Sequence, residues 1–542
     1  MMAFGAIATN AAAAGTANPY AYNLKVTGVE QNSSGENEAT GETVTFCYTL
    51  NAPAVKITLN VYNGTETLFS QEYTDATLLT AGDHTLEVAV ADMGDGGVDA
   101  SWSIVATGET LTAPVETSTT YTFWSPYGIA VDNNPESAHF GRILVTESQM
   151  NMSTSYWTNS EGVLAGIYEF DPQMQRVQNA SGTYGYNGGL PFAHYKYPSN
   201  SSVYTAKKVR ISDDGRIFVG VLDCLRNPIY EVNPDNLNEW TPIFQGTMAA
   251  DTSGVVTDAD GNVVAIASAS MDVVGSGENL KIVNLSCKGG QVYNYSYFST
   301  DIYNLGTATS WSTAPSENVA GLSKQYTISS SGANVAFDKD GKGIWYVQYR
   351  GTPTEAQPAI KHVYKADDGT WTEDYSDITT VARGGGVGFN KDYTLLAIPT
   401  AAFNFAIYDM SEVEKAMQAH RVQAPTTLTP KYTMTTTVVR GFNDFAFDYA
   451  DNLYTCDNGK EKFYCIALPR DNVNCEVPAP SGQSFKLPML DTGVSEATVA
   501  KTVASTTYVN LNGATSDKPF DGVNVVITHY TDGTKKVTKV IK

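Results

Sequence analysis

The clearest pattern in this chain is a phrase of two short apolar runs separated by a polar turn, which recurs along its middle. The phrase reads GIAVDNNPESAHFGRILVTES at 128–148, KVRISDDGRIFVGVL at 208–222, GVVTDADGNVVAIAS at 254–268, NVAFDKDGKGIWYVQ at 334–348 and DFAFDYADNLYTCDN at 444–458. Apolar runs of about four to eight residues bounded by Gly, Asn and Asp are typical of buried β-strands joined by tight turns. Each phrase therefore predicts two neighbouring strands.

The spacing of these phrases predicts a repeat architecture over residues 118–480. The first strand of each unit ends on Asp132, Ser212, Asp258, Asp338, Asn390 or Asp448. A second phrase, interpreted as the third strand, follows as GIYEFDP (166–172), PIYEVNP (228–234), KIVN (281–284), KHVYKAD (361–367), FAIYDM (405–410) and FYCIAL (463–468). Because one four-stranded unit cannot bury its own faces, the repeat predicts a six-bladed β-propeller with loop insertions.

The segments before and after this repeat also have the residue pattern of β-strands. In VKITLNVYNG, Val55, Ile57, Leu59 and Val61 would face one side of a strand, which predicts an Ig-like β-sandwich over 20–112. Short strands around a TDG turn predict a small C-terminal β-sandwich over 485–542. The expected fold class is all-β, and one helix is predicted at SEVEKAMQAH, where Ser411 and Glu414 form a capping box.

Three resemblances to known families follow from these motifs. TLNAPAVKITLNVYNG with TAGDHTLEVAV resembles the Ig-like domain of flagellar hook-cap type found in many secreted Bacteroidota proteins. Phrases such as PYGIAVD and GIYEFDP resemble NHL-repeat and gluconolactonase-like propellers, while Gly513, Gly522, Gly533 and the final KVIK resemble the C-terminal sorting domain of type IX secretion cargo. The resemblances imply a secreted, surface-displayed protein whose C-terminal domain engages the secretion machinery.

The N-terminal segment agrees with export. Residues 1–19, which begin MMAFGAIATNAAAAG, have the apolar core and small-residue end of a signal peptide and are interpreted as a signal-peptide remnant, with an alanine-rich tail as the alternative. No other stretch approaches the ~18 to 20 apolar residues that a membrane helix requires, so membrane insertion is not expected.

The net charge limits the class of partner, and the cysteine positions limit the expected disulfide bonds. The net charge of −23 repels phosphate backbones, so nucleic acid is not expected as a partner. The six cysteines are too scattered for a disulfide scaffold, and free, mostly buried thiols are expected. Pairing among Cys456, Cys465 and Cys475 is left open.

Propeller geometry predicts where a ligand would bind. The loop entering the first strand and the loop leaving the second open on one mouth of the central channel. Entering positions supply Tyr127, Arg383 and Arg440, and leaving positions supply Glu147, Asp223, Arg226, Arg350, Asp457 and Asn458. Such carboxylates and guanidinium groups could bind a sugar, or could pair with each other across a wet channel.

The gluconolactonase resemblance implies an alternative chemistry at this mouth. Such enzymes hold one divalent cation with acidic and amide side chains, and Glu147, Asp223 and Asp457 approximate that set. Apart from that cation no cofactor is expected. The chain has no H-E-x-x-H, no G-x-S-x-G and no phosphate-binding glycine loop, so binding is favoured over catalysis.

Aromatic insertions favour glycan as the ligand. Tyr156, Trp157, Tyr184 and Tyr186 lie among Gly, Ser and Asn, as expected of exposed loops. Aromatic faces stack on sugar rings, although the same residues also suit a protein interface. The leading hypothesis is a secreted cell-surface binding or adhesion protein that recognises a glycan or a surface protein. The alternatives are a metal-dependent enzyme acting on carbohydrate or lactone, and a structural surface component without a pocket.

Overall fold

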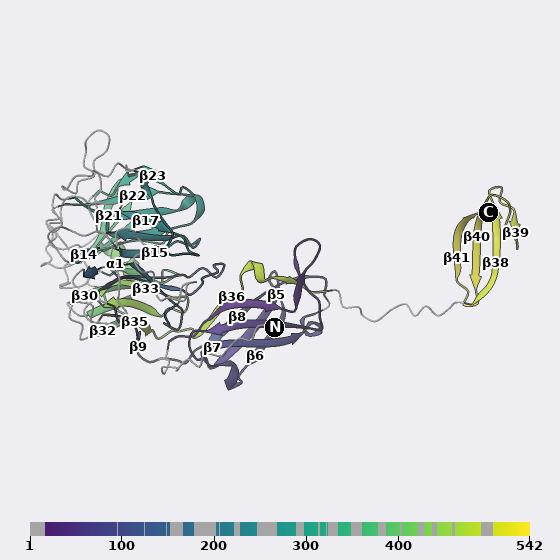
Figure 1. Cartoon of the computed structure of the whole chain (residues 1–542), viewed down its shortest axis with the longest axis horizontal. Helices are drawn as coiled ribbons and strands as arrows, with labels where there is room; N and C mark the ends of the chain where they lie inside the picture. The colour runs from purple at the N-terminus through teal and green to yellow at the C-terminus, as the bar shows by residue number, and fades with distance from the viewer. Residues whose placement is uncertain are drawn as a thin grey trace. The chain divides into compact units, whose positions relative to one another are not determined.

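The structure is a computed structural model whose described part is almost entirely β (Figure 1). It describes residues 17–94, 96–123, 125–147, 149–151, 166–177, 202–204, 206–221, 228–245, 268–288, 297–312, 315–320, 322, 334–347, 360–377, 386–401, 404–420, 428–435, 442–457, 461–488 and 502–542. The chain divides into one unit of residues 1–94 and 99–486 and a second of residues 95–98 and 487–542. The predicted signal segment lies mostly outside the described residues.

The first unit begins with two packed sheets, as the alternating pattern predicted. One sheet has the order β1 (Ala21–Thr27), β4 (Thr43–Leu50), β7 (Gly82–Ala89). The other contains β2 (Val29–Gln31), β3 (Asn37–Ala39), β8 (Asp99–Thr107), β5 (Lys56–Asn63) and β6 (Glu66–Tyr73). Ile57, Leu59 and Val61 are buried between the sheets, but Val55 precedes β5 and is 46% exposed, so its predicted place on the inner face is wrong.

This sandwich is completed by strands from the far end of the chain, which the predicted boundaries did not include. β36 (Asn474–Pro478) and β37 (Phe485–Lys486) both pair with β8 (Figure 1). The sandwich is therefore not confined to residues 20–112, and residues 474–478 do not belong to the repeat. The pairing satisfies a β8 edge that would otherwise expose backbone N–H and C=O groups.

Six antiparallel sheets hold most of the remaining described strands of the first unit. Their first, second and third strands are β10 (Pro126–Val131), β11 (Ile143–Glu147), β13 (Gly166–Phe170); β15 (Ala206–Ile211), β16 (Ile217–Val221), β17 (Ile229–Val232); β20 (Ser268–Val274), β21 (Lys281–Lys288), β22 (Tyr297–Asn304); β25 (Asn334–Phe337), β26 (Gly343–Val347), β27 (Ile360–Lys365); β29 (Gly388–Phe389), β30 (Leu395–Ala401), β31 (Asn404–Asp409); and β33 (Phe442–Phe447), β34 (Leu453–Asp457), β35 (Lys462–Ala467). Fourth strands are β18 (Trp240–Pro242), β24 (Glu317–Asn318), β28 (Trp371–Asp377), β32 (Tyr432–Thr435) and β9 (Val115–Ser118), in sheets two to six. Two small pairs, β12 (Gln149–Asn151) with β14 (Ser202–Tyr204) and β19 (Phe244–Gln245) with β23 (Trp311–Ser312), lie outside these sheets.

Apolar packing links the six sheets in a closed cycle. Successive sheets share buried clusters that join Ala130 to Val209, Phe218 to Met271, Leu285 to Val335, Trp345 to Leu396 and Phe405 to Phe445. A sixth cluster joins Tyr454 of the last sheet to Tyr168 of the first. Every sheet thus buries both faces against its neighbours, an order of packing compatible with the predicted propeller.

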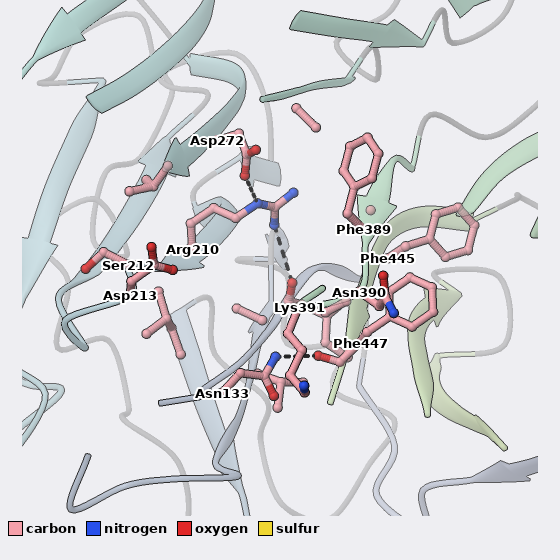
Figure 2. Close-up of a pocket in the computed structure, with 18 of the residues that line it drawn as sticks. Asn133, Arg210, Ser212, Asp213, Asp272, Phe389, Asn390, Lys391, Phe445 and Phe447 are labelled. Carbon is pink, nitrogen blue, oxygen red and sulfur yellow. Dashed lines mark hydrogen bonds and ion pairs between the residues drawn. The ribbon is translucent and has the colours of Figure 1, made fainter. Parts of the chain in front are cut away.

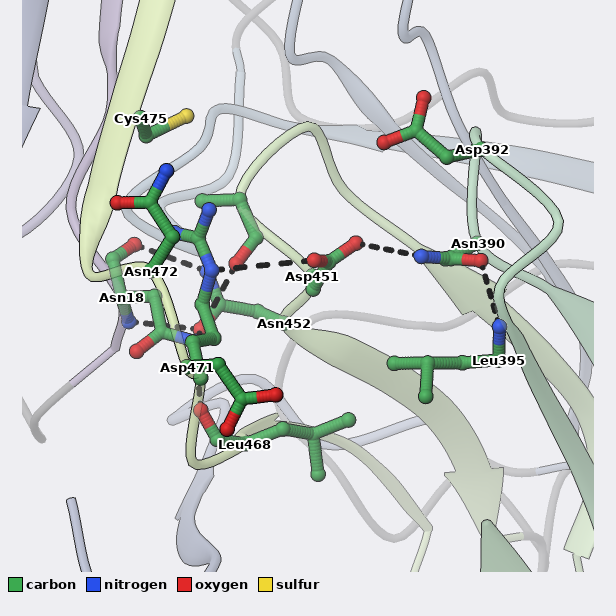
Figure 3. A network of polar contacts seen from close by, with 12 residues as sticks. Asn18, Asn390, Asp392, Leu395, Asp451, Asn452, Leu468, Asp471, Asn472 and Cys475 are labelled. Carbon is green, nitrogen blue, oxygen red and sulfur yellow. Dashed lines mark hydrogen bonds and ion pairs between the residues drawn. The ribbon is translucent and has the colours of Figure 1, made fainter. Parts of the chain in front are cut away.

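The last sheet takes its fourth strand from the beginning of the repeat. β9 precedes the first sheet in sequence but pairs with β35, and the Thr119 N–H donates to the Phe463 carbonyl at 3.0 Å. The sandwich is attached to the same sheet, because Asn18 donates to the Asn452 side chain (2.7 Å) and to the Leu468 carbonyl (3.0 Å) (Figure 3). Segments from both ends of the repeat therefore meet at one sheet.

Five of the six aligned strand-end residues organise the turns that follow. The Asp132 carboxylate accepts from the Asn134 N–H, two residues on. Ser212, Asp338, Asn390 and Asp448 each accept from the N–H four residues on. Side-chain oxygens of Asp, Asn and Ser stabilise tight turns in this way, which explains why the repeat keeps them there. Asp258 lies outside the described residues.

Two local predictions differ from the structure, and a third agrees with it. KIVN lies in β21, the second rather than the third described strand of its sheet, because β20 is the first strand described there. α1 (Met410–His420) begins earlier than expected, and its first turn is capped by Asp409, which accepts from the Ser411 N–H and hydroxyl, so the Ser411 capping box is wrong. Cys47, Cys456, Cys465 and Cys475 are free, as expected; the last three are buried, whereas Cys47 is half-buried.

The second unit is a single antiparallel sheet in its described part, not the predicted sandwich. Its order is β39 (Thr515–Ser516), β38 (Val503–Asn510), β40 (Val523–Tyr530), β41 (Lys535–Ile541). No second layer covers it among residues 502–542, so Leu511 and Ile541 are 79% and 75% exposed. The pattern predicted these strands, but the second sheet of the predicted sandwich is not found among residues 502–542.

The fourth sheet buries a histidine between two carboxylates. His362 of β27 contacts Asp374 Oδ1 through Nδ1 at 2.5 Å and Asp338 Oδ2 through Nε2 at 3.6 Å. Burial disfavours the charged imidazole, but Asp338 and Asp374 outweigh it and raise the pKa of His362. The imidazolium is thus a stabilising partner for both carboxylates.

We predict that replacing His362 lowers the free energy of unfolding more in acid than in alkali. A raised folded-state pKa means that the stabilisation is fully present below the ordinary pKa near 6.5 and is lost as the pH rises through the raised value. The difference in unfolding free energy between the native chain and His362→Gln should be larger at about pH 6 than at about pH 9. Urea titrations at both pH values, with His84→Gln as control, would measure it, and a pH-independent difference would contradict the charge assignment.

We also predict that blocking β9 weakens the repeat. Thr119→Pro removes the N–H that binds the Phe463 carbonyl, at a cost of about 1 to 3 kcal/mol in unfolding free energy. Thr119→Ala keeps that N–H and loses only the hydroxyl that accepts from Tyr121, so it should cost about 1 kcal/mol or less. If denaturant titration gave equal losses of unfolding free energy for the two variants, β9 pairing would contribute nothing to stability.

Candidate functional site

Charged residues on the first strands form a buried ion network. Lys208 and Arg210 of β15 both bind Asp444 of β33: Lys208 Nζ lies 2.8 Å from Oδ1, and the two terminal nitrogens of Arg210 lie 2.8 and 2.9 Å from the carboxylate. Arg210 Nε also binds Asp272 of β20 at 2.8 Å. Lys208 and Asp444 are wholly buried. Two positive and two negative charges balance each other.

The network extends to the backbone of two further first strands. Asp444 accepts from the Ile129 N–H at 3.1 Å, and Asp272 accepts from the Phe337 N–H at 2.8 Å. Burial lowers the pKa of Lys208 to about 8, with Asp444 opposing the shift. Burial opposes ionisation of Asp444 as well, yet Arg210 and Lys208 hold its pKa below the usual range. The cluster ties β10, β15, β20, β25 and β33 together.

A cavity of about 370 Å³ lies beside this network, towards the ends of the first strands (Figure 2). All six sheets contribute to its lining, which includes Ala130, Arg210, Asp272, Ala336, Phe389 and Phe447. Turn residues after the strands complete it, among them Asn133, Asp213 and Tyr393. Figure 2 shows Arg210 bonded to Asp272 and Asn133 bonded to the Phe447 backbone. The floor is thus the ion network and the rim is formed by turns.

One wall of the cavity is aromatic. The rings of Phe389 and Tyr393 stack with centroids 5.0 Å apart and an interplanar angle of 22°. Burial raises the pKa of the Tyr393 hydroxyl, and the carboxylates of Asp272 and Asp213 raise it further. The tyrosine therefore remains a neutral hydroxyl that can donate and accept hydrogen bonds.

The turn that carries Tyr393 is fixed by Asn390. Its side-chain oxygen accepts from the N–H groups of Thr394 (2.8 Å) and Leu395 (2.9 Å), while its amide donates to Asp451 at 3.0 Å (Figure 3). Tyr393 itself has a φ of 55°, in the left-handed region that non-glycine residues rarely adopt. These bonds position the ring at the cavity.

Three of the predicted site residues are described, and all are buried. Both oxygens of Glu147 accept from the Ser125 N–H, at 2.8 and 2.9 Å, and Lys207 Nζ lies 3.9 Å from the centre of the Tyr127 ring. Glu147 and Asp457 face the starts of β10 and β33, at the opposite end of the first strands from the cavity. The remaining predicted residues lie outside the described part: Tyr156, Trp157, Tyr184, Tyr186, Asp223, Arg226, Arg350, Arg383, Arg440 and Asn458.

Sequence reasoning missed the residues of the cavity and its floor. Their signal was the occurrence of charges inside otherwise apolar strands, as with Lys208 and Arg210 in AKKVRI and Asp444 in FNDFAF. Such residues are rarely buried unless they are paired, so their presence in predicted core strands pointed to a network. The turn residue Tyr393 carried no comparable signal.

Metal ligation has no candidate in the part of the chain that is described. Within it, no three His, Cys, Asp or Glu residues lie close enough to hold one ion. Asp223, a member of the predicted ligand set, lies beyond that part. No described helix is long and apolar enough to cross a membrane.

We predict that Asp444→Asn destabilises the fold strongly. The variant leaves two buried cations with one carboxylate, and breaking a buried ion pair costs about 3 to 5 kcal/mol in unfolding free energy. Asp392→Asn, which alters a largely exposed pair with Lys391, should change the value by less than about 1 kcal/mol. Guanidinium unfolding of the three proteins would measure both, and similar values for the two variants would show that the network does not support the fold.

Comparison with known proteins provides no family for this chain. No protein-family model matches it, and no curated protein matches it either. Among solved structures it is similar to a structural genomics protein of unknown function from Bacteroides thetaiotaomicron VPI-5482, solved at 1.70 Å resolution. The match has 10% identity and a TM-score of 0.34, and covers 82% of this chain and 98% of the other. A match at that TM-score assigns neither a fold nor an activity.

Proposed function

We propose that this chain is a secreted, cell-surface binding protein that recognises a glycan in the cavity beside the ion network. The observation that carries the proposal is the composition of the cavity, where all six sheets contribute and a stacked aromatic pair faces polar side chains. Its volume of about 370 Å³ lies within the range of small-ligand sites, about 300 to 1,000 Å³.

The chemistry of the lining suits a sugar ring. Phe389 and Tyr393 offer an apolar surface on which the C–H face of a pyranose can stack. Asp213, Asn133 and the Tyr393 hydroxyl line the same cavity and can bind sugar hydroxyls. A concave site of this size favours a small ring over the flat surface of a folded protein partner.

The proposed scaffold is a six-bladed β-propeller. The closed cycle of apolar clusters supports it, as does the exchange of β9 from the start of the repeat into the last sheet. Closing a ring in this way protects sheet edges without added domains. Export, display on a Bacteroidota cell surface and passage through type IX secretion belong to the proposal through the sequence resemblances of the two termini.

The metal-dependent enzyme remains a prediction about the other end of the first strands. Its ligand set needs Asp223 together with Glu147 and Asp457, and Asp223 is outside the described residues. In the structure the carboxylate of Glu147 is engaged by the Ser125 N–H. The proposed glycan site does not depend on those residues.

We predict that the aromatic wall is required for glycan binding. The full chain should bind members of a glycan array, and Tyr393→Ala should weaken the best ligand about 10-fold, the equivalent of losing about 1.4 kcal/mol of stacking. Tyr393→Phe keeps the ring and should retain most of the affinity, and Trp157→Ala should bind like the native chain.

Two results would contradict this proposal. An array without any bound glycan would exclude the function. Loss of binding in Trp157→Ala but not in Tyr393→Ala would assign glycan binding to the predicted aromatic insertions and not to the cavity. Isothermal titration with the best array ligand would quantify each variant.

A further inference from the structure

The positively charged groups that line the cavity are already engaged within the protein. Arg210 binds Asp444 and Asp272 and also donates to the Val209 carbonyl at 2.8 Å. Lys391 Nζ lies 3.0 Å from Asp392 and 4.5 Å from the centre of the Tyr449 ring. Neither cation needs an anionic ligand for its charge to be balanced.

The groups that remain open are mainly acceptors. Asn133 uses its amide N–H to bind the Phe447 carbonyl at 2.8 Å, and its buried Oδ1 has no hydrogen-bond partner within the described residues. Asp213 borders the same cavity, where burial and the neighbouring Asp214 raise its pKa. The Tyr393 hydroxyl lines the same cavity and can donate as well as accept.

The charge of the cavity follows from the same contacts. Lys208 and Arg210 balance Asp444 and Asp272, and Lys391 is paired with Asp392, which leaves Asp213 as the surplus charge among the described lining residues. Asp214 next to it accepts from the Ser212 hydroxyl and the Gly277 N–H, so it faces the turn backbone. A ligand that complements this site must bring donors and a positive charge.

We propose, on the basis of the glycan-binding function above, that the cavity selects an amino sugar with a free, protonated amine. Its ring would lie on Phe389 and Tyr393, and its ammonium would bind the Asp213 carboxylate. An ammonium offers three donors and no acceptor, which matches the open groups. N-acetylation removes the charge and adds a carbonyl acceptor, and an acidic sugar would be repelled by Asp213.

The aromatic wall distinguishes this ligand from a lysine side chain, the other common source of an ammonium. The face of an aromatic ring complements the C–H face of a pyranose over a larger area than a flexible alkyl chain can cover. A cavity of about 370 Å³ also exceeds what one alkyl chain fills. We therefore assign the amine to a sugar.

The test is a titration of the full chain with a glucosamine tetrasaccharide and with its fully N-acetylated counterpart. The native chain should bind the free-amine form at least about 10-fold more tightly, and the preference should decrease as salt is added. Asp213→Asn should abolish the preference while changing affinity for the acetylated form by less than about 2-fold. Asp340→Asn, in the corresponding turn of the fourth sheet and outside the lining, should keep it.

Several outcomes would overturn the inference, and they separate it from the proposed function. Equal binding of both tetrasaccharides, or tighter binding of the acetylated one, would leave glycan binding intact but exclude amine selection. If Asp340→Asn lost the preference for the free-amine form as Asp213→Asn does, the preference would be a general effect of protein charge. Tighter binding of tetralysine would assign the amine to a protein partner, and a cavity that binds no glycan of any kind would exclude both proposals.

Discussion

The interaction on which the repeat depends is the buried ion network centred on Asp444. Apolar clusters pack neighbouring sheets in pairs, but the bonds of Lys208 and Arg210 to Asp444 join the first strands of the second and sixth sheets, which are not neighbours. Desolvating these charges carries a large cost, which is offset only because each carboxylate oxygen has donors at hydrogen-bond distance. A polar centre of this kind favours one arrangement of the strands over others that would leave a charge unpaired.

The chain ends support this arrangement from outside. β9 occupies the last sheet, Asn18 binds that same sheet, and β36 and β37 return to the sandwich, so the sandwich and the repeat are interleaved in sequence. Contacts between residues so far apart in the chain are lost together when either end is removed. The first unit is therefore one structural unit and cannot be separated at the boundaries that sequence composition indicates.

The network also determines the chemistry of the cavity above it. Arg210 and Lys208 are already paired with Asp272 and Asp444 in the floor. The open groups on the rim therefore include the acceptors of Asp213 and Asn133 and the hydroxyl of Tyr393. The same interaction thus holds the strands and leaves the site acidic.

The sequence by itself determined what depends on short-range patterns. Strand periodicity, the third-strand phrases of five units and the turn residues Asp132, Ser212, Asp338, Asn390 and Asp448 are local, since a strand or a turn is specified by its own few residues. Tertiary structure alone decided the long-range partners: β36 and β37 on β8, and the end of the first strands at which a cavity opens. These features depend on which residues meet across hundreds of positions, and no local pattern of charge or hydrophobicity encodes that meeting.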